Sequence, residues 1–145
     1  MKRRTLGQKP IEEEMNRGRT LIPGWVYLDR PLTSTSWDGD GFSTTAKTTI
    51  DLSSVFGAPA KIKAVDVKLS ARDSGSAGGT AWIIISPNAT AGQGRGVNLA
   101  GHDSDSFIEN DFVCPCDSAG DIYYQCTATG ASTLDVVLEI WGYYL

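Results

Sequence analysis

The sequence predicts an all-β protein: an antiparallel β-sandwich of about eight strands, with jelly-roll or other Greek-key connectivity, behind an extended N-terminal arm. The 145 residues include 16 Gly and 6 Pro, which indicates frequent turns between short elements. Several stretches alternate apolar and polar residues, as strands with one buried face do. Turn residues separate these stretches at intervals of roughly 10–15 residues, a spacing that favours a sandwich.

The first half of the chain contains four candidate strands. Residues 21–28 are apolar around a Pro-Gly turn, and residues 42–52 are rich in Thr, which suits a half-exposed strand. The alternation is clearest in the third candidate, whose buried face is expected to carry Val65, Val67, Leu69 and Ala71. Residues 81–85 are continuously apolar, which predicts a short strand covered on both faces.

The second half contains four more candidate strands, within residues 91–101, 106–113, 121–127 and 133–145. Gly-rich or Ser- and Asp-rich turns separate them. The last segment alternates strongly and ends in aromatic residues. We therefore expect it to be integrated into a sheet, and expect removal of the last five residues to be destructive.

The charge distribution divides the chain into an arm, residues 1–20, and a sandwich domain, residues 21–145. The arm has six basic and three acidic side chains, a net charge of +3, whereas the rest has a net charge of −7. A basic end on an acidic body can contact the acidic surface of a neighbour, often another copy. For an isolated chain the alternative is a disordered tail.

Composition also argues against several partners. No apolar run approaches the ~20 residues that cross a bilayer. Met1–Arg4 resembles the charged start of a secretion signal, but polar residues follow it, so we expect a soluble protein made in the cytosol. The sequence argues against nucleic acid as a partner, because a Glu run interrupts the basic residues and the acidic body would be repelled.

The cysteines do not indicate a disulfide framework, because Cys114, Cys116 and Cys126 are few and odd in number. With His102, the only histidine, they could supply four zinc ligands. Cys114-Pro115-Cys116 nevertheless lacks the C-x-x-C spacing of zinc and redox sites. Buried or half-buried thiols on strands are the favoured interpretation, and no cofactor or metal is expected.

Acidic loops offer one further metal candidate. Asp38-Gly-Asp-Gly41 resembles the opening of a calcium loop, but the later ligands are missing at the usual spacing, so a turn is favoured. Asp103 and Asp105 carry the same ambiguity.

Catalysis has little support in the sequence. His102 lies among Ser and Asp residues, but no nucleophile elbow frames a serine. A carboxylate pair for glycoside hydrolysis is conceivable, yet most of the carboxylates occupy turns such as residues 117–120, where Asp accepts local backbone hydrogen bonds. We expect a protein that is not an enzyme.

The tryptophans are candidate contact residues. Trp82 lies in an apolar run and is expected in the core, and Trp25 and Trp141 in the core or a subunit interface. Trp37 lies in a polar loop and is the tryptophan expected to be exposed, where it could contact a protein or stack on a sugar ring.

Three segments, residues 51–69, 120–126 and 138–145, resemble small structural proteins of tailed bacteriophages. The resemblance extends over roughly residues 30–145 and implies a sandwich domain, attached to a virion by a short N-terminal segment and often trimeric. It also implies a place in the capsid decoration, the head–tail junction, the tail tip or a fibre. No catalytic residue is implied.

The sequence therefore predicts a non-enzymatic virion protein that forms a homo-oligomer, with a trimer favoured, and contacts other virion proteins. The expected assembly residues in the arm are charged: Lys2, Arg3, Arg4, Lys9, Glu12, Glu13, Glu14, Arg17 and Arg19. The alternative is a carbohydrate- or receptor-binding module that uses Trp37. A glycan array with a Trp37→Ala control would discriminate the two.

Overall fold

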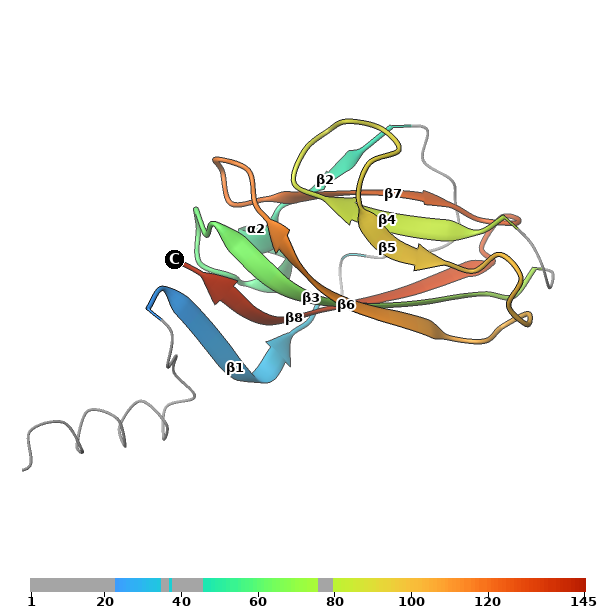
Figure 1. Ribbon diagram of the computed structural model, residues 1–145, viewed down its shortest axis with the longest axis horizontal. Coiled ribbons are helices and arrows are strands. Elements are labelled where there is room, and N and C mark those ends of the chain that lie inside the picture. Colours follow the sequence, from blue (N-terminus) through green and yellow to red (C-terminus); the bar gives the residue numbers. More distant parts are fainter. Residues whose placement is uncertain (1–22, 35–36, 38–45, 76–79) are drawn as a thin grey trace, which may run out of the picture.

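The computed structural model describes residues 23–34, 37, 46–75 and 80–145 (Figure 1). They form two four-stranded antiparallel sheets and one short helix, α2 (Leu52–Phe56). The strands in chain order are β1 (Trp25–Leu32), β2 (Thr48–Ile50), β3 (Ala64–Asp73), β4 (Trp82–Ser86), β5 (Arg95–Asn98), β6 (Ile108–Pro115), β7 (Ile122–Thr127) and β8 (Leu134–Tyr144).

The strand pairing is that of a long hairpin rolled into two layers. β1 pairs with β8, β2 with β7, β3 with β6, and β4 with β5, all antiparallel. Rolling adds the pairs β3–β8 and β4–β7. Sheet A then has the order β1-β8-β3-β6 and sheet B the order β2-β7-β4-β5, which is jelly-roll connectivity. The predicted fold class is confirmed.

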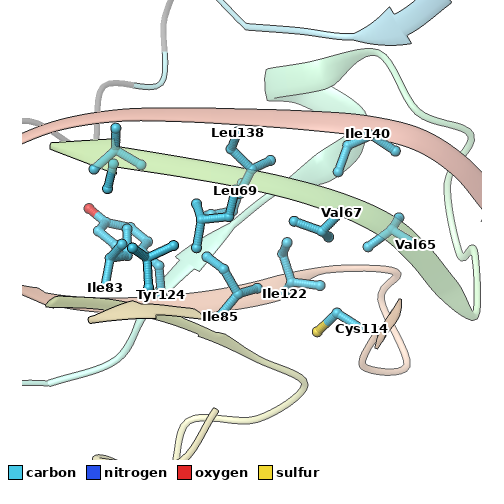
Figure 2. Close-up of a cluster of buried hydrophobic side chains, with 14 of the residues drawn as sticks. Val65, Val67, Leu69, Ile83, Ile85, Cys114, Ile122, Tyr124, Leu138 and Ile140 are labelled. Carbon is cyan, nitrogen blue, oxygen red and sulfur yellow. The ribbon is translucent and has the colours of Figure 1, made fainter. Parts of the chain in front are cut away.

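The core lies between the two sheets, where apolar side chains of both inner faces meet (Figure 2). The expected inner face of β3 is confirmed, because Val65, Val67, Leu69 and Ala71 are fully buried. Opposite them, sheet B contributes the buried residues Ile83, Ile85, Ile122 and Tyr124. Alternation along the strands is thus what separates the core from the outer faces.

The predicted strand over residues 42–52 is only partly present. Residues 42–45 lie outside the described residues, β2 is three residues long, and Leu52 begins α2. The Asp51 side chain caps this helix by accepting a hydrogen bond from the Ser54 backbone N–H at 2.9 Å. Gly57 ends it in the left-handed conformation, with φ of 71°.

β4 is buried on one face, and the prediction that both faces are covered is wrong in part. Ile83 and Ile85 are buried, whereas Trp82 and Ile84 are half-buried on the outer side of sheet B. The loop that connects β4 to β5 folds over that side, where the Gly92 N–H donates to Gln125 of β7 at 2.9 Å. Trp82 is therefore a half-buried residue of the outer face and not a core residue.

Candidate functional site

Four aromatic side chains gather on the outer face of sheet A, at the ends of β1 and β8. We call Trp25, Tyr27, Trp141 and Tyr144 the aromatic patch. The rings of Trp25 and Tyr27 stack with centroids 6.3 Å apart, and those of Trp25 and Tyr144 lie 5.7 Å apart. Such ring pairs form a continuous apolar surface with defined geometry.

The pairing of β1 with β8 brings these residues together. Trp25 lies opposite Tyr144, and Tyr27 lies opposite Gly142. Residues two apart on a strand share a face, so Trp25, Tyr27 and Tyr144 all lie on the outer face of sheet A. Between Asp66 and the next residue of β3 the register shifts, which makes Trp141 the extra residue of a β-bulge. Alternation along β8 already points the Trp141 ring outward, and the bulge returns Gly142 and Tyr144 to that same outer face.

The aromatic patch remains partly open to solvent. Tyr27 is 45% exposed and Trp141 37% exposed. The Trp141 Nε1–H donates to the Glu139 carboxylate at 2.9 Å, which fixes the ring while leaving its apolar surface accessible. Val113 and Val137 are also exposed, from β6 and β8 of the same sheet. Exposed apolar side chains among polar neighbours are typical of interaction surfaces.

A carboxylate pair lies beside the patch. Asp66 of β3 is opposite Gly142 on one side and Val113 on the other. Burial beneath its neighbours raises the pKa of Asp66 above its ordinary value, and the nearby Asp111 carboxylate raises it further. The ionised carboxylate of Asp66 is therefore unfavourable at this part of the surface.

No family model and no curated protein match the sequence. Solved structures do match the fold, among them the coat protein of tobacco streak virus. The two chains are 8% identical, the TM-score is 0.46, and the match covers 87% of this chain and 90% of that chain. The jelly-roll assignment itself depends on the strand order of this chain.

The predicted arm, residues 1–20, lies outside the described residues, and so do all nine of its charged assembly residues. The structure does show where the described chain begins. Gly24 has φ of 88° and lies under the Tyr144 ring, and its carbonyl accepts a hydrogen bond from the Leu145 N–H at 2.9 Å. The described chain therefore begins beside the aromatic patch.

The prediction that Trp37 is the exposed tryptophan is wrong. Its ring is half-buried against the core and packs edge-on against Tyr124, with centroids 5.4 Å apart, and beside Phe56. A polar loop suggested exposure, but the folded chain turns this ring inward. The exposed tryptophan is Trp141, for which the sequence allowed either a core or an interface position.

The candidate metal and catalytic residues do not converge on a site within the described residues. No group of three or more His, Cys, Asp or Glu there is arranged to hold a metal ion. Cys114 and Cys126 are buried on β6 and β7, as the favoured interpretation predicted, whereas Cys116 is half-buried just after β6, and none of the three forms a disulfide with another described residue. The predicted turn at residues 38–41 lies entirely outside the described residues.

The loop that carries His102 has structural contacts of its own. The His102 N–H donates to the Leu99 carbonyl at 3.1 Å, and Asp105 lies 3.4 Å from the Arg72 guanidinium. Asp103 accepts the Ser106 N–H through its backbone carbonyl. These interactions shape the connection between β5 and β6. In the described part of the chain, no helix is long and apolar enough to cross a membrane.

Proposed function

We propose that this chain is a non-enzymatic structural protein of a virion, and that it associates with copies of itself through the aromatic patch. The observation that carries the proposal is the exposure of Trp141 and Tyr27 on a sheet face. Trp and Tyr are the side chains that most often dominate the binding energy of protein interfaces. A jelly roll is common in capsid and lectin domains, but fold alone does not assign function.

Three further parts of the proposal come from the sequence. The resemblance of residues 51–69, 120–126 and 138–145 to tailed-bacteriophage structural proteins supports a phage virion. The charge contrast between the arm and the acidic body supports contacts between copies. A closed symmetric oligomer, with a trimer favoured, would bury the aromatic patch of every copy.

Self-association is tested by sedimentation velocity on the full chain over a range of concentrations. Trp141→Ser and Tyr27→Ser are each expected to weaken association by at least tenfold, because a central aromatic contributes about 2 kcal/mol or more. Phe107→Ser is the matched control, since Phe107 is equally exposed but lies under Arg72 away from the patch. A wild-type chain that stays monomeric at every concentration would contradict the proposal.

The virion location needs a separate measurement. Particles purified from the source culture are digested and analysed by quantitative mass spectrometry. We expect peptides of this chain in constant ratio to the other particle proteins across a density gradient. Peptides found only in the soluble fraction would refute a virion role while leaving self-association untouched.

The exposed rings also favour one second candidate, a carbohydrate-binding module. Aromatic side chains beside polar groups such as Glu139 can stack on sugar rings. A glycan array probed with the wild-type chain, and with Trp141→Ala as the binding-deficient variant, separates the two functions. Trp37→Ala is not suitable for this purpose, because that ring packs against the core.

A further inference from the structure

An apolar groove opens between the two sheets at the edge formed by β4, β5 and β6. Its volume is about 270 Å³. Most of its lining is apolar and comes from both sheets: Ile85, Pro87, Gly94, Phe112, Val113, Cys114 and Pro115, with Arg95 as the charged member. Apolar concavities with one charged group bind ligands that have an apolar part and an opposite charge.

The groove exists because β5 is shorter than β6. The two edge strands approach each other where the Asn110 side chain donates to the Gly96 carbonyl at 2.9 Å. β5 begins only at Arg95, whereas β6 continues to Pro115. The last residues of β6 therefore pair with β3 on one side and have no described strand on the side that faces β5. An edge strand of this kind presents unpaired main-chain groups.

The groove is positively charged, whereas the sandwich domain as a whole is acidic. Arg95 is exposed and forms no ion pair with another described residue. Lys47 lies nearby, where its ammonium group donates to Ser86 and to the Gln93 carbonyl. Burial raises the pKa of Cys114 to about 11, although Lys47 and Arg95 are both near enough to oppose that rise. The thiol therefore stays neutral and belongs to the apolar floor.

We propose that this groove binds residues 11–15 of the arm of a second copy, Ile-Glu-Glu-Glu-Met, with an apolar end residue in the groove and the glutamates against Arg95. The proposal rests on the proposed self-association and names one of its contacts. Within the arm, this segment alone combines acidic residues in a run with apolar residues on both sides. The negative charge of this segment complements the positive charge of Arg95, and this complementarity identifies the segment as the occupant of the groove.

The charges on either side of the segment also match the edge of β6. In an extended chain, four residues span about 13 Å. In the arm, Lys9 and Arg17 each lie four residues from Glu13. On β6, Glu109 likewise lies four residues from Val113, and Asp111 lies between Glu109 and Val113. In either chain direction, a basic residue of the arm therefore reaches the acidic part of β6 when Glu13 is beside the groove.

The chain length and its path favour a second copy. The described chain begins just before β1, at the edge of sheet A opposite β6. To reach its own groove the arm would have to cross the outer face of sheet A, over the aromatic patch that self-association covers. An arm of this length spans up to about 70 Å when extended, enough to reach a neighbouring subunit.

The test uses charge-swapped full chains that all carry Trp141→Ser, so that association through the patch is weakened equally in every chain. One chain adds Arg95→Glu, and the other adds Glu12→Lys, Glu13→Lys and Glu14→Lys. Each chain alone should associate at least tenfold more weakly than the Trp141→Ser parent. Their mixture should form a complex, because each arm then faces a groove of opposite charge. A single chain with all four charge swaps should associate like the parent.

Lys61→Glu is the matched control, because it makes the same charge change at an exposed side chain that does not line the groove, and it should leave association unchanged. Circular dichroism verifies that every variant is folded. The proposal is overturned if Arg95→Glu has no effect or if the mixture forms no complex. Neither result bears on the aromatic patch, whose own test compares Trp141→Ser with Phe107→Ser.

Discussion

The carboxylate of Asp73 and the side chain of Thr129 form a hydrogen-bonded link between the end of β3 and the loop that connects β7 to β8. Thr129 donates to Asp73 from its hydroxyl and, at 2.9 Å, from its backbone N–H. Gly75 N–H and the Thr133 hydroxyl also donate, at 2.8 and 3.1 Å. One nearly buried carboxylate thus joins sheet A to sheet B at this end of the sandwich.

Asp73→Ala is expected to lower the free energy of unfolding by about 2–3 kcal/mol, because it removes the charged acceptor of four part-buried hydrogen bonds. The change is measured by urea denaturation at neutral pH. Asp135→Ala is the control, since that carboxylate is half-exposed and its ion pair with Arg72 contributes under about 1 kcal/mol. Equal losses in the two variants would contradict the assigned role of Asp73.

The same link predicts a dependence on pH. Burial alone would raise the pKa of Asp73, but the hydrogen bonds from Thr129, Gly75 and Thr133 outweigh it and hold the pKa below its ordinary value. The stabilisation is therefore complete above the unfolded pKa of about 3.9 and disappears as the pH falls through the lower folded value. The difference in unfolding free energy between wild type and Asp73→Asn should narrow over that acidic range.

Asp66 is expected to behave in the opposite way. Burial and Asp111 raise its pKa, so the ionised carboxylate destabilises the fold at pH values above the folded pKa. This penalty diminishes as the pH falls toward the unfolded value of about 3.9. Asp66→Asn should therefore raise the midpoint of thermal unfolding at neutral pH and have no effect at acidic pH.

Asp103→Asn is the charge-matched control for that measurement. Its side chain is exposed in the β5–β6 connection, so its removal should leave the midpoint unchanged at both pH values. If both variants stabilise the protein equally, the cause is the reduced net charge of the acidic domain, and the specific role of Asp66 is refuted.

The parts of the fold that the sequence predicted are those that local alternation determines. β3 and β8 show clear alternation, and both have the expected inner faces. Helix α2 was missed because five residues are too short to establish a helical period, although Asp51 and Gly57 are recognisable cap residues. The half-buried outer face of β4 was missed because the coverage of a strand depends on loops elsewhere in the chain.

The candidate site was harder to predict for the same physical reason. Trp25 and Trp141 are far apart in the sequence, and only the pairing of β1 with β8 brings them onto one face. The bulge at Trp141 arises from the register of β8 against β3, which alternation does not encode. Trp37 was misjudged because the polarity of its neighbours in the sequence does not report the packing of its ring on Tyr124.

Gly96 is expected to tolerate no side chain. A Cβ atom there would lie 1.8 Å from the Ile83 carbonyl oxygen, so Gly96→Ala forces β5 away from β4. The expected loss is about 3 kcal/mol or more. Gly101→Ala, with φ of 82° and open space around the new Cβ, should cost only about 1 kcal/mol. Urea denaturation measures the loss of unfolding free energy in each variant. A smaller loss for Gly96→Ala than for Gly101→Ala would contradict the prediction.

The buried thiols are expected to react slowly in the folded protein. Burial raises the pKa of Cys114 to about 11 and that of Cys116 to about 12, so little thiolate is present at pH 8. Iodoacetamide should label both residues much more slowly in buffer than in urea, where the ordinary thiol pKa is about 8.5. Peptide mass spectrometry locates the label, and rapid native labelling of Cys114 would show that the groove floor is open.

Removal of residues 141–145 is expected to prevent folding. In this segment β8 lies between β1 and β3, with Tyr144 opposite both Trp25 and Ala64, and the Tyr144 carbonyl accepts the Lys63 N–H at 2.7 Å. Without it, residues 25–27 of β1 lose their only strand neighbour in the described chain, and only the pair of Leu32 with Ile140 remains. We expect an insoluble product or a chain without near-ultraviolet circular dichroism. Removal of Leu145 alone is the control, because it removes an exposed side chain and one backbone hydrogen bond, to Gly24, and leaves the strand pairing of β8 intact. A soluble, cooperatively unfolding 1–140 fragment would show that the end of β8 is not required for folding.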